Sequence, residues 1–195
     1  MNKRTRNISF LSLFIAIELL MIAVPFLGYI PIGPLRATTL HIPVLIAGIV
    51  LGKKQGAILG FIFGMSSVII NTMQPTLTSF VFSPFISGSL ISLVIAIIPR
   101  MLIGYLAGLI YEKIKDKHQS LAIITGSLIG SFANTVLVLG GIYFLFGNQY
   151  ANVLGMNLDQ LLPYLLGIIA TNGLLEAVLG SCIVMIVSHI LIRIY

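Results

Sequence analysis

The sequence has 195 residues, of which 58% are hydrophobic and only 8% are charged, and its formal net charge is +6. Soluble domains average about 25% charged residues, so this composition excludes an ordinary soluble protein and indicates an all-α polytopic membrane protein. The positive residues form short patches at predicted helix ends, not one continuous face, which argues against binding of nucleic acid.

The first predicted helix covers about residues 8–27, a near-continuous apolar stretch that follows a basic amino-terminal segment. About 20 helical residues span about 30 Å, the thickness of one bilayer core. The stretch resembles a signal peptide, but it is too long and no A-x-A cleavage motif follows it. We therefore interpret it as an uncleaved first helix.

This helix has two different faces. Ser9, Ser12, Ala16 and Ala23 fall on one arc, and Glu18 falls nearly opposite Ser9. A strip of small residues allows another helix to approach closely, whereas a lone carboxylate is expected to point into the bundle. The strip has two interpretations, which the residues alone leave open: a docking face for a partner protein, or packing within this chain.

The next segments are short. Residues 28–40 contain two glycines and two prolines in seven positions, which predicts a loop. A short helix is predicted at about 41–51, a basic turn at 52–55 and a third helix at about 56–70. This third helix has glycine at every fourth position, a spacing that permits close helix contact in lipid. These glycines are Gly56, Gly60 and Gly64.

Residues 71–90 are rich in Asn, Thr, Ser, Pro and Gly and also contain three phenylalanines. Such an apolar but helix-poor segment is consistent with a lid over a cavity. It is equally consistent with an interfacial loop whose aromatic side chains anchor it at the membrane surface. The sequence does not separate these two interpretations.

The fourth helix is predicted at about 91–112, and Arg100 is the only charge between residues 85 and 111. A guanidinium stays protonated in proteins, and in hydrocarbon it costs from roughly 3 to more than 10 kcal/mol. Arg100 is therefore expected to face the bundle interior or a watery cavity, close to an anion or to acceptors. The partner is either an anionic ligand or a structural carboxylate, Glu18 or Glu176.

The last two helices are predicted at about 121–146 and 161–192, with a polar loop at 147–160 between them. Asn134 lies near the middle of the first, and Asn172 and Glu176 share one face of the second because they are four residues apart. We thus expect a single domain, residues 1–195, folded as a compact bundle of six transmembrane helices.

Lysine and arginine positions predict the orientation. With both ends on one side, nine of these residues fall on that side and one, Arg36, on the other, so both termini are expected to be cytoplasmic. The nine are Lys3, Arg4, Arg6, Lys53, Lys54, Lys113, Lys115, Lys117 and Arg193.

Several polar residues then fall at similar depth, in a constellation that predicts a pocket open to the outside. His41 has two interpretations, a contact at the start of its helix or a ligand group, and it is kept among the candidates. The predicted substrate-binding residues are Arg100, Asn134, Asn71, Thr72, Asn172, Thr38, His41 and Phe82.

Motifs of several chemistries are absent from the sequence. It has no Walker loop for ATP and no H-E-x-x-H zinc motif, its three histidines are scattered, and no paired carboxylates suggest acid–base catalysis. The one cysteine, Cys182, excludes an intrachain disulfide. These observations favour binding or transport over catalysis, with no metal and no cofactor bound by this chain.

Five segments of the sequence, in this order, resemble one known family. They are IPIGPLRATTLHIP (30–43), LGKKQGAILGFIFG (51–64), NTMQPTLTSFVFSP (71–84), PRMLIG (99–104) and NGLLE (172–176). They are similar to the substrate-binding membrane subunits (S components) of energy-coupling factor (ECF) vitamin transporters, and look closest to the pantothenate-type branch. The resemblance covers essentially the whole chain.

The resemblance implies a six-helix subunit of the bacterial cytoplasmic membrane that captures a vitamin with high affinity. It implies docking onto a transmembrane coupling protein and two ATPases, which hydrolyse the ATP, and toppling to deliver the vitamin inward. In that family two alanines four apart on the first helix meet the coupling protein. The matching positions here are Ser12 and Ala16, and the serine departs from the pattern. The phenylalanine-rich segment would then be the gating loop.

Two alternatives of other classes remain open at this stage. In an independent ion-coupled transporter of a small anionic metabolite, Glu18 or Glu176 would be the coupling carboxylate, although no internal repeat relates the two halves. In a membrane enzyme of lipid metabolism, Arg100 would hold a phosphate, although the expected metal ligands are missing.

Overall fold

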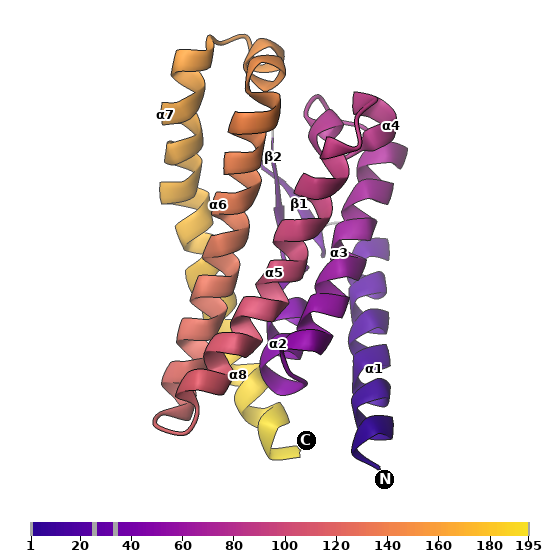
Figure 1. Cartoon of the computed structure of the whole chain (residues 1–195), viewed down its shortest axis with the longest axis vertical. Helices are drawn as coiled ribbons and strands as arrows, with labels where there is room; N and C mark the ends of the chain where they lie inside the picture. The colour runs from indigo at the N-terminus through magenta and orange to yellow at the C-terminus, as the bar shows by residue number, and fades with distance from the viewer. Residues whose placement is uncertain (1, 25–26, 33–34, 195) are drawn as a thin grey trace.

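The computed structural model of the chain describes residues 2–24, 27–32 and 35–194. Its helices run along one axis and both termini lie at the same end (Figure 1). The six predicted helices correspond to α1 (Lys3–Ala23), α2 (His41–Val50), α3 (Lys53–Met73), α5 (Ile91–Ile114), α6 (Gln119–Leu154) and a continuous rod. The rod consists of α7 (Leu158–Ile168), the π-helical turn η2 (Ile169–Gly173) and α8 (Leu174–Ile194). The predicted all-α polytopic fold class is confirmed.

Helix α2 is too short to cross a membrane, unlike the long helices of the bundle. Within the described residues, five helical stretches are long and apolar enough to cross a membrane, whereas α2 is a shorter apolar helix. Nine of the ten α2 residues are buried, because α2 lies inside the bundle between α3, α5 and α8. Helix α5 packs against α2, α3 and α6 and so forms the centre of the bundle.

The predicted boundaries of two helices were wrong. Helix α1 begins at Lys3, not at residue 8, and ends at Ala23 before Pro25, a residue type that disfavours helix at the preceding position. Helix α6 continues to Leu154, through most of the segment predicted as a polar loop. It does so because Tyr150 and Ala151 are buried in an apolar cluster with Leu161 of α7. It ends at Gly155, whose φ of +70° is a left-handed conformation that favours glycine.

The predicted loop at 28–40 contains an antiparallel hairpin of β1 (Tyr29–Ile32) and β2 (Leu35–Thr38). Tyr29 pairs with Thr38 and Pro31 with Arg36. Proline breaks helices, but a two-stranded sheet has only edge strands, where a missing N–H is tolerated. The hairpin ends next to α2, so Thr38 is placed at the wall of the bundle.

The glycines of α3 allow its backbone to touch that of α5. A Cβ at Gly64 would lie 2.8 Å from the carbonyl oxygen of Ala96, and one at Gly56 would lie 2.7 Å from that of Gly104. Between them, a Cβ at Gly60 would overlap the carbonyl oxygen of Arg100. Any larger side chain would therefore push the two helices apart. This close contact between α3 and α5 fixes the position of Arg100 along α3.

Residues 74–90 fold as two short turns, η1 (Ser79–Val81) and α4 (Pro84–Ser87), tied to their surroundings by hydroxyl groups. Ser79 Oγ donates to Asn71 Oδ1 at 2.8 Å, and Ser92 Oγ donates to the Phe80 carbonyl at 2.9 Å. Phe80 packs on Phe146 of α6, with ring centroids 5.8 Å apart.

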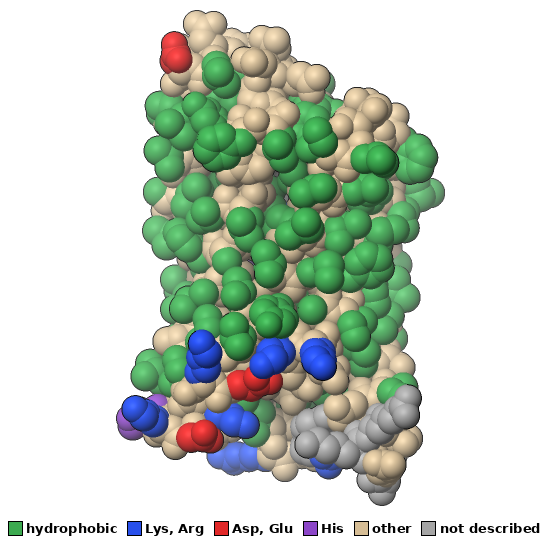
Figure 2. Space-filling view, viewed as in Figure 1, with side chains coloured by type: hydrophobic (Ala, Val, Ile, Leu, Met, Phe, Trp, Pro, Cys, Tyr) green, Lys and Arg blue, Asp and Glu red, His purple; other side chains and the backbone are tan. Residues whose placement is uncertain are grey.

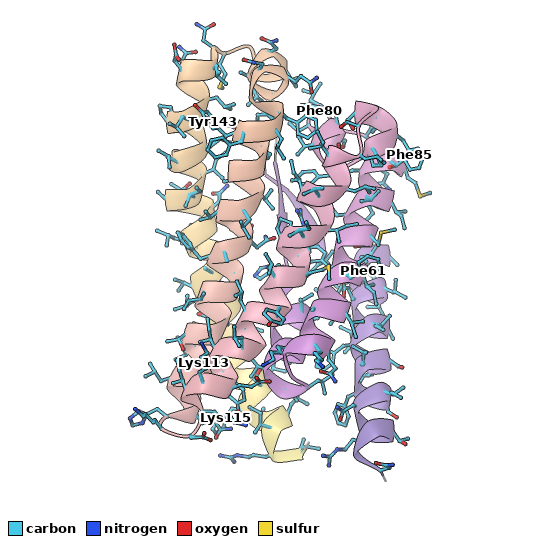
Figure 3. All side chains as sticks on the ribbon, in the orientation of Figure 1. Phe61, Phe80, Phe85, Lys113, Lys115 and Tyr143 are labelled. Atoms are coloured by element: carbon cyan, nitrogen blue, oxygen red, sulfur yellow. The ribbon has the colours of Figure 1, made fainter. Side chains whose placement is uncertain are left out.

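The surface of the molecule is divided along its length. Lys and Arg side chains gather at the end that holds both termini, and apolar side chains cover the middle of the visible face (Figure 2). Lys113 and Lys115 lie at that charged end, whereas Phe85, 81% exposed, points outward at the opposite end (Figure 3). This arrangement fits a bundle whose sides face lipid and whose charged end faces water.

Candidate ligand-binding site

A cavity of about 130 Å³ opens beside residues 76–82, which belong to the segment that lies at the end of the bundle away from the termini (Figure 1). Its walls come from β2, α3, the 74–90 segment, α5, α6 and the rod of α7, η2 and α8, so residues far apart in the sequence meet there. The lining residues are Thr38, Phe63, Ser67, Asn71, Thr76, Thr78, Phe82, Arg100, Asn134, Thr135, Val138, Leu139, Ile168, Asn172, Gly173 and Glu176.

Six of the eight predicted substrate-binding residues line this cavity. They are Thr38, Asn71, Phe82, Arg100, Asn134 and Asn172. Glu176, which the sequence placed on the same helix face as Asn172, also lines the cavity. Among the lining residues that sequence reasoning missed, Ser67 carried a usable signal, because it precedes Asn71 by one helical turn and so shares a face with it.

The remaining two predicted residues lie behind the cavity wall. Thr72 Oγ1 bonds to the Val68 carbonyl and to Ser83 Oγ, both at 2.7 Å. Because neighbouring helical residues point about 100° apart, Asn71 and Thr72 do not face the same cavity. His41 is 5% exposed, and its Nδ1 lies 2.7 Å from the Thr38 carbonyl, which is the helix-start contact.

The Arg100 side chain is buried in the cavity wall, with 7% of the residue exposed. Its Nη1 donates a hydrogen bond of 2.7 Å to the Ile95 carbonyl. The guanidinium carbon lies 4.9 Å from the centre of the Phe82 ring and 5.8 Å from that of Phe63. The two aromatic faces and the carbonyl stabilise the positive charge where water is scarce.

The two carboxylates considered as structural partners of Arg100 lie in different places. Glu18 is fully buried on α1, and neither of its carboxylate oxygens has a hydrogen-bond partner in the described part of the chain. It therefore does not bond to Arg100. Glu176 lines the same cavity from α8, so the described residues of the cavity wall include both a cationic and an acidic side chain.

The amide side chains of the cavity differ in how many hydrogen bonds they make. Asn71 donates to the Ser67 carbonyl at 2.8 Å and accepts from Ser79 Oγ, so it ties α3 to η1. Asn134 Oδ1 is buried and makes no hydrogen bond within the described residues. That acceptor is thus available to a donor that enters the cavity.

The π-helical turn η2 forms one wall of the cavity and contains Asn172 and Gly173. Such turns often occur at functional sites, because the extra residue re-aims the side chains that follow. A Cβ at Gly173 would lie 2.9 Å from Thr135 Cγ2, so this glycine lets η2 approach α6 closely. Altogether the cavity offers a cation, an acidic group, amides and hydroxyls, a set suited to a small hydroxylated anion.

On α1 the two predicted docking residues face outward. Ser12 and Ala16 are exposed, whereas Phe14 and Glu18 on the opposite face are buried against the bundle.

Comparison with known proteins gives matches along almost the whole chain. Residues 6–188 match the family described as "ECF transporter, substrate-specific component". The chain is 37% identical over 188 residues to the pantothenic acid transporter PanT of Lactococcus lactis subsp. cremoris (strain MG1363), a match that covers 91% of this chain and 89% of the relative. It is 28% identical over 203 residues to the pantothenate transporter PanT of Leuconostoc mesenteroides subsp. mesenteroides (strain ATCC 8293), covering 99% of this chain and 95% of the relative.

Proposed function

Because this chain belongs to the family of substrate-specific components of ECF transporters, we propose that it captures pantothenate for import across a bacterial cytoplasmic membrane. The family is one of transporter components, which take a vitamin as substrate and work with an ECF module. The identity of the vitamin rests on the two relatives and on the chemistry of the cavity.

The observation that carries the proposal is the buried guanidinium of Arg100 in the cavity wall, whose other described residues are neutral polar and apolar groups and Glu176. Pantothenate has one carboxylate, two hydroxyls and one amide. A carboxylate removed from water needs a cation or several donors, and the planar fork of arginine can meet both oxygens. We assign the carboxylate to Arg100.

The rest of the ligand matches the remaining polar groups. Asn134 and Asn172 can each donate and accept, which suits the hydroxyls and the amide. Glu176 can accept from a hydroxyl. In this proposal Asn71, Thr38 and Phe82 complete the wall, while Thr72 and His41 support it from behind through Ser83 and Thr38.

The remaining steps of transport are assigned to partners. In this proposal Ser12 and Ala16 dock onto the transmembrane coupling protein of the ECF module, and two ATPases hydrolyse ATP, so this chain binds no cofactor. Segment 71–90 closes over the ligand, since Thr76, Thr78 and Phe82 border the cavity. Saturating pantothenate should then slow hydrogen exchange in this segment, and equal exchange with and without ligand would remove the gating step.

Two measurements test the function as a whole. Calorimetry of the purified chain against a panel of vitamins should give tight binding of pantothenate and of no other vitamin in the panel. Vesicles that contain the chain with its ECF module should accumulate pantothenate only when ATP is supplied. Uptake by the chain alone along an ion gradient would instead support a secondary transporter, and turnover of a phosphorylated lipid would support an enzyme.

A further inference from the structure

Helix α5 contains a proline, Pro99, directly before Arg100. In a regular α-helix the N–H of residue 99 would donate to the carbonyl of residue 95. Proline has no N–H, so the Ile95 carbonyl has no backbone donor from position 99. Inside a membrane a freed carbonyl has to be satisfied by another group of the protein.

The group that satisfies this carbonyl is the Arg100 side chain. Arg100 Nη1 donates to Ile95 O at 2.7 Å, and the bond is buried. Arg100 thus supplies the donor that the Ile95 carbonyl lacks because residue 99 is proline. The bond fixes one arm of the guanidinium fork, and the rings of Phe82 and Phe63 lie 4.9 and 5.8 Å from its carbon.

The α5 backbone at this point is fixed independently of the side chain. A Cβ at Gly60 of α3 would overlap the Arg100 carbonyl oxygen and would lie 2.8 Å from Met101 Cα. The closeness of the two helices therefore sets the position of the Arg100 main chain. The Ile95 carbonyl then sets the direction of its side chain, which reaches the cavity wall.

We propose that Pro99 is a positioning residue for the anion site: by keeping the Ile95 carbonyl free, it holds the Arg100 guanidinium in the orientation that receives the carboxylate of the ligand. This proposal rests on the proposed function, in which Arg100 binds that carboxylate. A fork that is already oriented loses less freedom when the ligand arrives, which is how preorganisation raises affinity.

The substitution Pro99→Ala tests this role because it restores the missing donor. The new N–H would bond to the Ile95 carbonyl and compete with Arg100, while alanine keeps α5 helical. The affinity for pantothenate is expected to fall about tenfold, the effect of weakening one hydrogen bond to a charged group. The affinity for pantothenol, in which a primary alcohol replaces the carboxylate, should change by less than about twofold on the same scale.

A matched control removes a different helix-interior proline. Pro163 lies inside α7, is exposed and is not part of the cavity wall. Pro163→Ala should therefore leave the ratio of the two affinities at its wild-type value. If Pro99→Ala leaves the ratio of the two affinities unchanged, whether or not both fall, the positioning role is wrong.

A second variant separates the missing donor from the shape of the proline ring. An α-hydroxy acid introduced at position 99 places an ester there, which lacks both the N–H and the ring. Because the Ile95 carbonyl stays free, this variant should keep the wild-type preference for the acid. An ester variant that loses this preference overturns the inference, and it also decides the question if Pro99→Ala fails to fold.

The same measurements distinguish this inference from the proposed function. If Arg100→Ala loses pantothenate while Pro99→Ala keeps the wild-type ratio, only the role of Pro99 fails. If folded Arg100→Ala binds pantothenate normally, the assignment of the carboxylate to Arg100 fails, whatever Pro99→Ala does.

Discussion

Arg100 combines a permanent charge with a position deep in the bundle, so its removal has two possible consequences. Taking away one partner of a buried charge contact costs about 2–5 kcal/mol, which corresponds to roughly 30- to 4,000-fold in affinity. Arg100→Ala is therefore expected nearly to abolish pantothenate binding, and Arg100→Lys to retain part of it without two-point geometry.

The measurement is calorimetry, accompanied by thermal unfolding of the same sample. Loss of affinity in a protein that unfolds at the wild-type temperature supports a ligand role. A large loss of stability would instead make Arg100 a structural residue of the bundle.

Replacing Asn134 tests its contact with the ligand without a loss of protein stability. Its Oδ1 is buried without a hydrogen bond in the described part of the chain, and leaving such an atom unpaired costs about 1–3 kcal/mol. Asn134→Leu removes the unpaired atom, so the free energy of unfolding of the ligand-free protein should rise or stay equal. Pantothenate affinity should fall about 5- to 150-fold. Unchanged affinity would exclude Asn134 from the ligand contacts.

At the scale of elements, α1 presents Ser12 and Ala16 on an exposed face. Ser12→Phe together with Ala16→Phe is expected to abolish assembly with the ECF module and ATP-driven uptake, because bulky side chains prevent close helix approach. Pantothenate binding by the isolated chain should stay close to wild type, since both residues are exposed and lie outside the cavity wall.

The same helix provides the control. Leu13 and Ile17 are also exposed and four residues apart, but they lie about 100° around the helix from the strip. Leu13→Phe with Ile17→Phe should leave assembly and uptake intact. If the Ser12 and Ala16 variant loses ligand binding as strongly as uptake, the strip serves internal packing instead.

The elements differ in how far the sequence predicts them. Apolar length alone predicted the existence and order of the six helices, because each must match the bilayer or hide inside the bundle. The continuation of α6 beyond residue 146 was missed because it depends on the burial of Tyr150 by distant residues. The hairpin was missed because Pro31 and its neighbours read as helix breakers, and breaking a helix does not exclude an edge strand.

The lining of the cavity was predicted in part. A charge or amide inside an apolar helix must face the interior, and this rule places Arg100, Asn134 and Asn172 in one cavity. The rule does not apply at helix ends, where His41 and Thr72 satisfy local backbone and hydroxyl groups instead. Phe63 is one of many apolar residues in its helix, so only the packing of the helices reveals it as part of the wall.

At the scale of the whole molecule, the charge distribution predicts how the chain lies in the membrane. Asp116 and Asp159 are both exposed and lie at opposite ends, in the α5–α6 turn and in the first turn of α7. In a chain in which Cys182 is replaced by serine, Asp159→Cys should react with an impermeant thiol reagent on intact cells. Asp116→Cys should react only after the membrane is opened, and the reverse pattern would overturn the cytoplasmic placement of the termini.

The helices of this bundle differ in length. Helix α6 has 36 residues and α1 has 21, so their lengths are about 54 Å and 32 Å, against a hydrocarbon core of about 30 Å. The apolar part of α6, residues 121–146, is itself about 39 Å long and includes Phe144, which is 83% exposed. This apolar part is longer than the hydrocarbon core, so the mismatch is relieved by tilting or by local thickening of the lipid. Acyl-chain length therefore becomes a variable in the energetics of this protein, with thin membranes favouring inclined bundles and thick ones favouring upright bundles.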